Sequence, residues 1–192
     1  ITVFWMGCLY FVLKFLRYAL ESWSPLVVEQ TFGLAPHYAG YVATCFDWVG
    51  FLGVLIAGWV SDHVFHGRRH QTVMWMTAGM LACFGLLSLF GSISVGVFSV
   101  LLGLCGMMLM GPDSLICGIG AIDVGGRKQA LAAAGLINGM GSIGPICQEE
   151  IIGWLMSSRD TKHVFILLTL CAGLAWMGAI SLSRYCAKQG KL

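Results

Sequence analysis

One stretch of the sequence, from Gln71 to Pro112, contains no aspartate, glutamate, lysine or arginine. It is twice as long as the ~20 apolar residues that an α-helix needs to cross a bilayer, and Gly91-Ser92 interrupts it near its middle. Of the 192 residues, 58% are hydrophobic and only 10% are charged, whereas a soluble domain carries about 25% charged residues. The composition excludes a soluble enzyme, a disordered chain and a nucleic-acid-binding protein, and it indicates a polytopic membrane protein.

Hydropathy along the chain predicts an all-α fold. A β-barrel is excluded, because its strands would alternate apolar and polar residues, and these runs are apolar all round. Glycines spaced to let helices approach closely occur at Gly103 and Gly106 and at Gly135 and Gly139. The predicted spans cover residues 3–30, 38–61, 71–91, 95–121, 131–157 and 163–185.

The basic residues outside the spans predict the orientation. Seven lie on one side, after the second, fourth and sixth spans, and two lie on the other. Because basic loops stay in the cytoplasm, we expect both ends of the chain there, in the inner membrane if the source is bacterial. The sequence does not begin with Met, and we expect it to start inside a larger protein. The seven are Arg68, Arg69, Arg127, Lys128, Arg184, Lys188 and Lys191, and the two are Arg159 and Lys162.

Two basic residues, Lys14 and Arg17, lie deep inside the first span. A charge at membrane depth costs at least ~2.5 kcal/mol, so by default it faces a cavity or a partner. Tyr10, Lys14, Arg17 and Glu21 share one helical face. An Arg17–Glu21 pair that only stabilises the fold is the alternative. Two cations against one acid leave a surplus positive charge, which favours a bound anion such as phosphate or carboxylate.

Four acidic residues also lie within the spans. Asp47, in the second span, is interpreted as a salt-bridge partner of Lys14 or Arg17, with proton coupling as the alternative. Asp113 follows Pro112, next to a predicted kink. In the fifth span a polar stripe is expected to line the same cavity, whereas Glu150 is expected at the outer interface. The stripe contains Asn138, Ser142, Pro145 and Glu149.

Three patterns are interpreted as structural and predict neither a cofactor nor a metal. Residues 139–144 match GxGxxG, but a dinucleotide site needs a preceding strand and not an apolar helix. His63, His66 and His70 lie in a basic loop without a nearby cysteine. The eight cysteines form no CxxC pair and are interpreted as buried small hydrophobes. The sequence contains no nucleophile–base pair that would indicate an enzyme.

The segment GWVSDHVFHGRR, residues 58–69, resembles the G-x-x-x-D-[RK]-x-x-G-[RK]-[RK] loop of the major facilitator superfamily, lengthened by one residue. His63 stands where a basic residue is usual. We expect Asp62 to cap a helix end and to pair with Arg68 or Arg69 as a cytoplasmic latch. The residues that carry the motif are Gly58, Asp62, Gly67, Arg68 and Arg69.

A narrower resemblance covers nearly the whole chain. Leu16-Arg17-Tyr18-Ala19-Leu20-Glu21-Ser22-Trp23-Ser24-Pro25 is similar to the first helix of the C-terminal half of organophosphate:phosphate antiporters. Gly111-Pro112, Gly120-Ala121-Ile122-Asp123 and the glycines of residues 139–144 follow in the order seen in that family, whose eukaryotic sugar-phosphate exchangers also carry a Lys at the position of Lys14.

This resemblance implies the six-helix C-terminal half of an antiporter, paired with an N-terminal half absent from this sequence. It implies that Arg17 is one of two arginines that clamp the substrate phosphate, with Lys14 assisting. The implied activity is exchange of an organic phosphate, such as a sugar phosphate or glycerol 3-phosphate, for inorganic phosphate. Asp47 or Glu21 would hold the cations when the site is empty, and Asn138, Ser142 and Glu149 would contribute selectivity.

Two alternatives remain open at this point. The resembling family also includes hexose-phosphate sensors, and these residues do not separate binding from transport. A proton-coupled facilitator of a non-phosphorylated solute would use Asp47 or Glu149 as the proton carrier.

Overall fold

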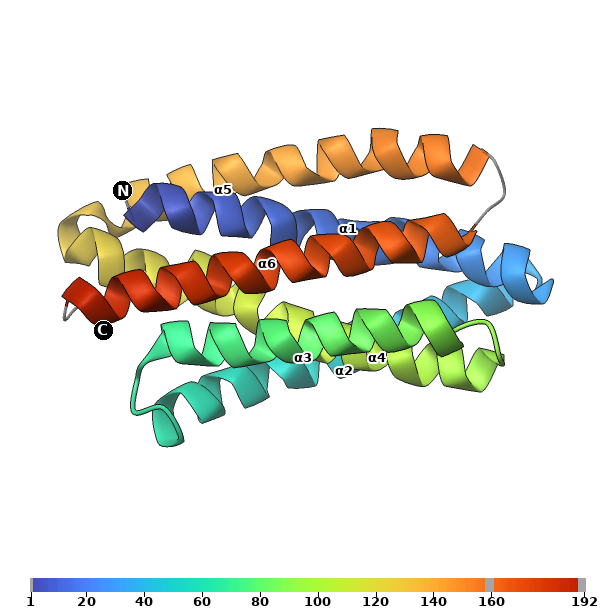
Figure 1. Ribbon diagram of the computed structural model, residues 1–192, viewed down its shortest axis with the longest axis horizontal. Helices are drawn as coiled ribbons and strands as arrows, with labels where there is room; N and C mark the ends of the chain where they lie inside the picture. Colours follow the sequence, from blue (N-terminus) through green and yellow to red (C-terminus); the bar gives the residue numbers. More distant parts are fainter. Residues whose placement is uncertain (1, 158–160, 190–192) are drawn as a thin grey trace.

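The computed structural model describes residues 2–157 and 161–189, with side chains except at 119–128 and 188–189. Six long helices are apolar enough to span a membrane, and no strand occurs among the described residues. This confirms the predicted all-α class (Figure 1). The elements are α1 (Thr2–Phe32), α2 (Pro36–His63), α3 (Arg69–Phe90), α4 (Val95–Ser114), the π-helix η1 (Leu115–Ile119), α5 (Gly120–Ser157) and α6 (Thr161–Gln189).

Local chemistry explains the turn between α1 and α2 and the start of α4. After α1 the chain reverses at Gly33, whose φ of 66° suits a residue without a Cβ. Pro36 opens α2 at a position where its missing N–H would be unpaired anyway. Ser94 caps α4, because its hydroxyl oxygen accepts a hydrogen bond from the Val97 N–H at 3.3 Å.

The connection between the fourth and fifth predicted spans differs from expectation. Residues 122–130, predicted to lie between two spans, are helical, and α4 passes through Pro112 and η1 directly into α5. Hydropathy marks where a helix leaves the apolar layer and not where the helix ends, and this segment leads into an alanine-rich stretch that favours helix. The side chains of Asp123, Arg127 and Lys128 lie outside those described, as do Arg159, Lys188 and Lys191.

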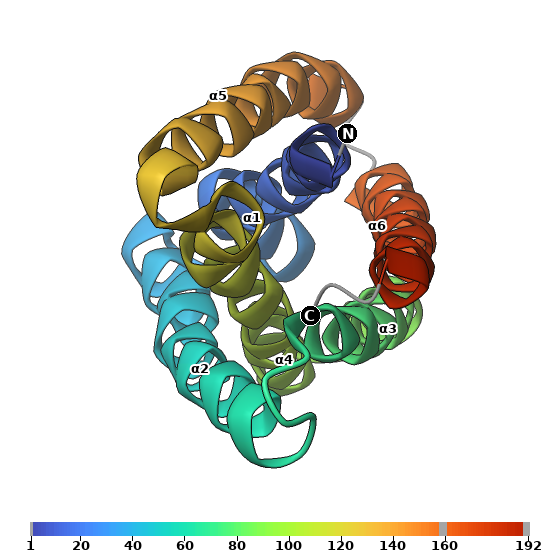
Figure 2. The same cartoon turned by 90° about the vertical axis from the view of Figure 1, so that its left-hand side faces the viewer.

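The helices pack mainly in three pairs, α1 with α5, α2 with α4, and α3 with α6. Figure 2 shows α1 and α4 between the two flanking helices α2 and α5, with α3 and α6 on another side of the bundle. Close approach depends on glycine: a Cβ at Gly106 would collide with the Phe46 carbonyl, and one at Gly144 with the Phe11 carbonyl. Around Gly135 and Gly139 the space is open, so these two glycines do not pack within this chain.

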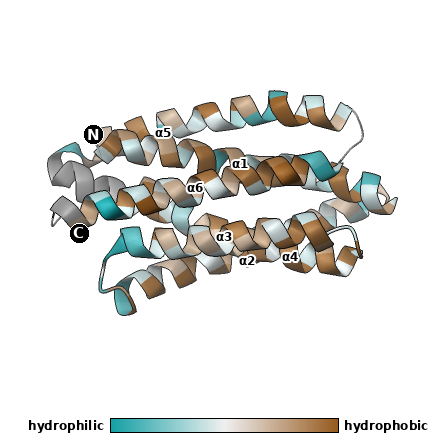
Figure 3. Ribbon diagram, viewed as in Figure 1, coloured by the Kyte–Doolittle hydropathy of each residue, from teal (hydrophilic) through white to brown (hydrophobic). Residues whose placement is uncertain are grey.

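The outer faces of the helices are apolar (Figure 3). Leu131, Trp48 and Trp154 are 91%, 76% and 75% exposed. Such a surface would be costly in water but is the expected surface toward lipid tails. The eight cysteines are free thiols. The chain is an integral, multi-pass membrane segment.

Candidate substrate site

A polar cluster lies where α1 meets α4 and α5, and two cations of α1 form its centre. The Lys14 ammonium donates hydrogen bonds to Asn138 Oδ1 at 2.8 Å and to Ser142 Oγ at 3.0 Å, both on α5. Its Nζ also lies 5.2 Å from the centre of the Tyr10 ring, and Tyr10 is buried. Lys14 is therefore held against α5 by neutral partners only, and the structure brings together four of the predicted site residues.

Arg17, one turn further along α1, turns toward α4. Its Nη1 donates to Asp113 Oδ2 at 3.0 Å, and its Nε lies 3.8 Å from Glu21 Oε2. The Arg17 side chain is 32% exposed, whereas Asp113 is buried. One guanidinium thus contacts a buried acid and an exposed acid, and because it has five N–H donors, neither acid occupies all of them.

The charge in this cluster does not balance locally. Lys14 forms no ion pair within 4.0 Å with any described acid, and its hydrogen-bond partners are an amide and a hydroxyl. The Oδ1 atom of Asp113 and the Nε atom of Arg17 are buried without hydrogen-bond partners. Buried polar atoms without partners are uncommon in native proteins and often mark functional positions. An anion that reaches this cluster would contact two cations, and it would compete with the buried Asp113 carboxylate for Arg17.

Asp47 was expected to balance Lys14 or Arg17, and the structure corrects that pairing. Asp47 is exposed on α2 and forms no ion pair with either cation among the described residues. Its neighbour Phe46 is buried against α4, and a single residue turns an α-helix by about 100°. Asp47 therefore leaves the packed face, and Asp113 on α4 takes the role of the buried counter-ion.

The sequence places Asp113 within a membrane span but assigns it no role. The signal that could have identified it is that Arg17 needs an acidic partner. Glu149, expected on the stripe with Asn138 and Ser142, instead accepts a hydrogen bond from Gln148 Nε2 at 2.8 Å. It is exposed and does not contact Lys14.

The loop that resembles the superfamily motif has a defined backbone. His66 and Gly67 both adopt positive φ, at 54° and 83°, and the Gly67 N–H donates to the Ser61 carbonyl at 2.8 Å. His63 stacks on Trp59 with ring centres 5.2 Å apart. Gly67 is thus the residue type that this turn requires.

The ion pair predicted for that loop is absent. Asp62 is exposed and forms no ion pair with Arg68 or Arg69. The reversal at residues 64–67 directs the chain away from the end of α2 before the arginines follow. Gly58 faces open space. The role of this loop as a cytoplasmic latch stays a prediction.

The GxGxxG pattern lies within α5, and its second and third glycines, Gly141 and Gly144, serve packing. A Cβ at Gly141 would collide with the Tyr10 ring, beside the Lys14 side chain, so this glycine lets α1 approach the site. Among residues 2–157 and 161–189, no group of three His, Cys, Asp or Glu side chains is arranged to hold a metal ion.

The chain as a whole is similar to several known membrane proteins. No family model matches the chain. It is 30% identical over 176 residues to the membrane sensor protein UhpC of Escherichia coli, and 32% identical over 178 residues to the glucose-6-phosphate exchanger SLC37A2 of Xenopus laevis. It is 28% identical over 155 residues to the glycerol-3-phosphate transporter of Bacillus subtilis.

These alignments cover 89%, 87% and 80% of this chain but only 39%, 35% and 35% of the three relatives. The chain thus spans little more than a third of the length of the curated relatives that it matches. Identity near 30% over almost all of this chain, with the ordered motifs and the six apolar helices, leaves one assignment. The chain belongs to the organophosphate:phosphate antiporter family of the major facilitator superfamily.

Proposed function

We propose that this chain is the C-terminal six-helix half of a membrane transporter. The transporter exchanges an organic phosphate, such as a sugar phosphate or glycerol 3-phosphate, for inorganic phosphate by alternating access, and it is not an enzyme. The observation that carries this proposal is the Lys14–Arg17 pair on one face of α1, with a single buried counter-ion. The names of the relatives support a phosphorylated substrate.

Arg17 is the phosphate-binding residue in this proposal. Its planar guanidinium presents parallel N–H donors that match two oxygens of a phosphate. In the empty site Asp113 occupies one of these donors. A phosphate dianion competes for the same donor with twice the charge and a second contact, so it displaces the carboxylate from Arg17.

Lys14 is the second phosphate contact. An ammonium has three donors, and two of them already bind Asn138 and Ser142. The third remains for the substrate. The two neutral partners hold the ammonium in place and present an amide and a hydroxyl beside it, where hydroxyl groups of a sugar or glycerol moiety are recognised.

A further six-helix half covers the cluster from the side of α2 and α5. Gly40 and Gly58 on α2 and Gly135 and Gly139 on α5 have no atom near the position of a Cβ, although such glycines usually mark close helix contacts. This open small-residue surface is the support for a missing N-terminal half. Transporter sites of this kind lie at the midplane, between the repeats.

The orientation follows from charge. Arg68 and Arg69 lie at the start of α3 and Arg184 lies near the end of α6, at the end of the bundle that we assign to the cytoplasm. Both ends of this segment are then cytoplasmic. In a bacterial source the membrane is the inner membrane.

A hexose-phosphate sensor is the second candidate, favoured by the similarity to the membrane sensor protein UhpC. Such a protein would bind a phosphorylated sugar at the same cations without moving it across the membrane. Binding measurements therefore do not separate the two functions, and flux measurements do.

The test is exchange by the full-length protein in proteoliposomes loaded with phosphate. We expect external labelled phosphate and hexose phosphate to exchange with the internal pool. Arg17→Lys keeps the charge but loses the fork, and it should lower exchange about 100-fold, the equivalent of ~2.7 kcal/mol. Arg184→Lys is the matched control and should retain activity.

Three results distinguish the candidates. Binding without exchange in the wild-type protein supports the sensor. Near-normal uptake by Arg17→Lys overturns the phosphate clamp and leaves the proton-coupled facilitator. Loss of exchange in both arginine variants overturns the specific role of Arg17.

A further inference from the structure

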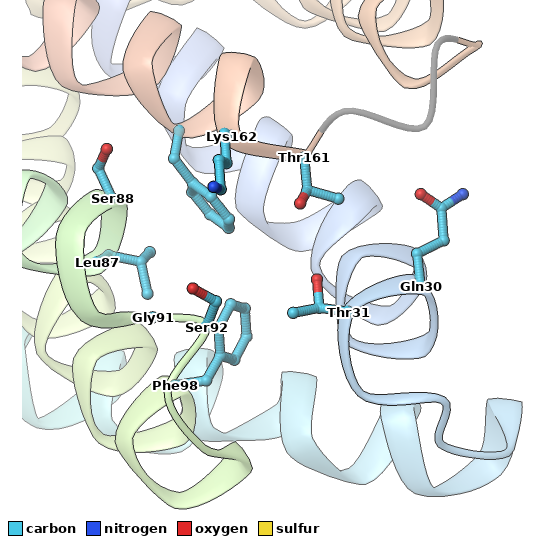
Figure 4. Close-up of a pocket in the computed structure, with 10 residues that line it drawn as sticks. Gln30, Thr31, Leu87, Ser88, Gly91, Ser92, Phe98, Thr161 and Lys162 are labelled. Carbon is cyan, nitrogen blue, oxygen red and sulfur yellow. The ribbon is translucent and has the colours of Figure 1, made fainter.

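A polar cavity lies at the end of the bundle where α1 and α3 finish and α6 begins, far from the cations of the substrate site. Its volume is about 170 Å³, well above the ~10–15 Å³ that one water needs. Figure 4 shows hydroxyls of Thr31 and Thr161 that face each other across it, with the Lys162 ammonium and Ser92 beside them.

The cavity contains an unsatisfied donor. The Thr31 Oγ1 atom is buried and has no hydrogen-bond partner. A buried hydroxyl without a partner costs about 1–3 kcal/mol, so a ligand that bonds to it would recover that energy. The floor is aromatic, formed by Phe98 and Phe165, whose ring centres are 6.1 Å apart.

An apolar groove continues from this cavity along the outside of the bundle. It runs between α3 and α6, has a volume of about 270 Å³ and shares Ser88 with the polar cavity. Its walls are Gly85, Leu89, Ile166 and Leu170. Leu89 is 72% and Leu170 64% exposed, and the space next to Gly85 is open.

The two parts together have the polarity of a lipid. From Lys162 to Leu170 the α6 face descends about 12 Å, which is more than a third of the ~30 Å apolar layer of a bilayer. The polar cavity lies at the helix ends, at the depth of lipid head groups. Lysine side chains near the ends of transmembrane helices reach the interface, where lipid phosphates lie. A soluble anion would not need the groove.

We propose that this cavity and groove bind one glycerophospholipid, its phosphate at Thr31, Thr161 and Lys162 and one acyl chain along α3 and α6. An ammonium has three donors, so Lys162 binds a phosphate oxygen while keeping another contact. This site is independent of the proposed transport function.

The test uses the full-length protein, stripped of lipid in detergent and titrated with phosphatidylglycerol under native mass spectrometry. We expect one tightly held lipid. Gly85→Phe fills the groove and should weaken binding about tenfold, since each buried CH₂ contributes ~0.8 kcal/mol. Gly96→Phe, at a helical glycine that is equally open but outside both pockets, is the matched control and should bind as wild type.

A second variant tests the contact with the head group. Lys162→Gln should weaken phosphatidylglycerol about tenfold through loss of a charge-assisted hydrogen bond. It should not change binding of diacylglycerol, which has the same chains and no phosphate. An excess of inorganic phosphate should not displace the lipid.

Each other outcome overturns the proposal. Wild-type affinity in both Gly85→Phe and Lys162→Gln shows that the lipid binds elsewhere. Displacement by inorganic phosphate shows that the cavity is a site for a free anion. A protein dimer that Gly85→Phe abolishes shows that a second copy of the chain fills the groove.

Discussion

Arg17 on α1 and Asp113 on α4, 96 positions apart in the sequence, form a hydrogen-bonded ion pair with 3.0 Å between Nη1 and Oδ2. Asp113 is buried, and its other oxygen has no partner. Removing Arg17 would leave the buried Asp113 carboxylate without its counter-ion, which is destabilising. The pair therefore stabilises the empty site, and a ligand that replaces Asp113 must supply a better counter-ion.

Asp113→Asn should raise the affinity for phosphate about tenfold, because the Asp113 carboxylate no longer competes with phosphate for Arg17. The same variant should melt at a lower temperature than the wild type without phosphate, and phosphate should stabilise it more than it stabilises the wild type. Thermal unfolding of the full-length protein across a phosphate titration measures both effects.

Glu150→Gln is the control for that experiment, since Glu150 is an exposed acid on α5 with no ion pair to Arg17. It should change neither the melting temperature nor the phosphate affinity. An unchanged affinity in Asp113→Asn would show that Asp113 only stabilises the fold and does not compete with substrate.

Ser142→Ala should raise the KM for the organic phosphate about three- to tenfold, with turnover largely retained. The substitution removes one of the two hydrogen bonds that hold Lys14, and a hydrogen bond to a charged group contributes about 1.5–3 kcal/mol at most. Initial rates of exchange at varied substrate concentration give the two constants.

Ser99→Ala provides a matched control, because both hydroxyls also bond to the carbonyl four residues earlier, Ser142 at 2.9 Å and Ser99 at 2.8 Å. Loss of that local bond is then common to the two variants. If both raise KM equally, the effect comes from the helix backbone and Lys14 has no part in it.

The sequence was sufficient to predict the helices and the position of the cations. A charge inside an apolar span must face a cavity or a partner, so Lys14 and Arg17 indicated the position of the polar cluster directly. The shared face of Asn138 and Ser142 followed from helical periodicity, and the structure brings that face to Lys14. Both inferences depend on local spacing within one helix.

The choice of counter-ion depends on packing between helices and was not predictable. Counted from the same end of the bundle, Arg17 lies 15 residues before Phe32, Asp47 lies 11 after Pro36 and Asp113 lies 18 after Val95. At about 1.5 Å per residue, both acids are within ~6 Å of the depth of Arg17. Only the rotation of α2 and α4 about their axes decides between them, and no motif encodes that rotation.

Gly106→Ala should lower the stability of the protein by about 1–3 kcal/mol, the usual cost of overpacking. An added methyl group would collide with the Phe46 carbonyl, which is backbone and cannot turn aside, so α2 and α4 must separate. Gly96→Ala has open space and should be neutral or slightly stabilising, because alanine favours helix. Unfolding in mild detergent compares the two, and equal stabilities would contradict the close α2–α4 packing.

Gly67→Val should destabilise the loop between α2 and α3, whereas Gly67→Asn should be tolerated. The φ of Gly67 is 83°, in a region that costs an ordinary residue about 1–2 kcal/mol and a β-branched one more, while asparagine adopts it more readily. Faster hydrogen–deuterium exchange in residues 64–70 of Gly67→Val would report the loss of the Gly67 N–H bond to the Ser61 carbonyl.

His66→Gly provides the opposite test, because His66 already bears this strain at a φ of 54°. The change should leave the stability of the protein unchanged or raise it by up to ~1 kcal/mol. A loss of stability as large as that in Gly67→Val would show that the His66 side chain, and not the backbone conformation, holds the loop.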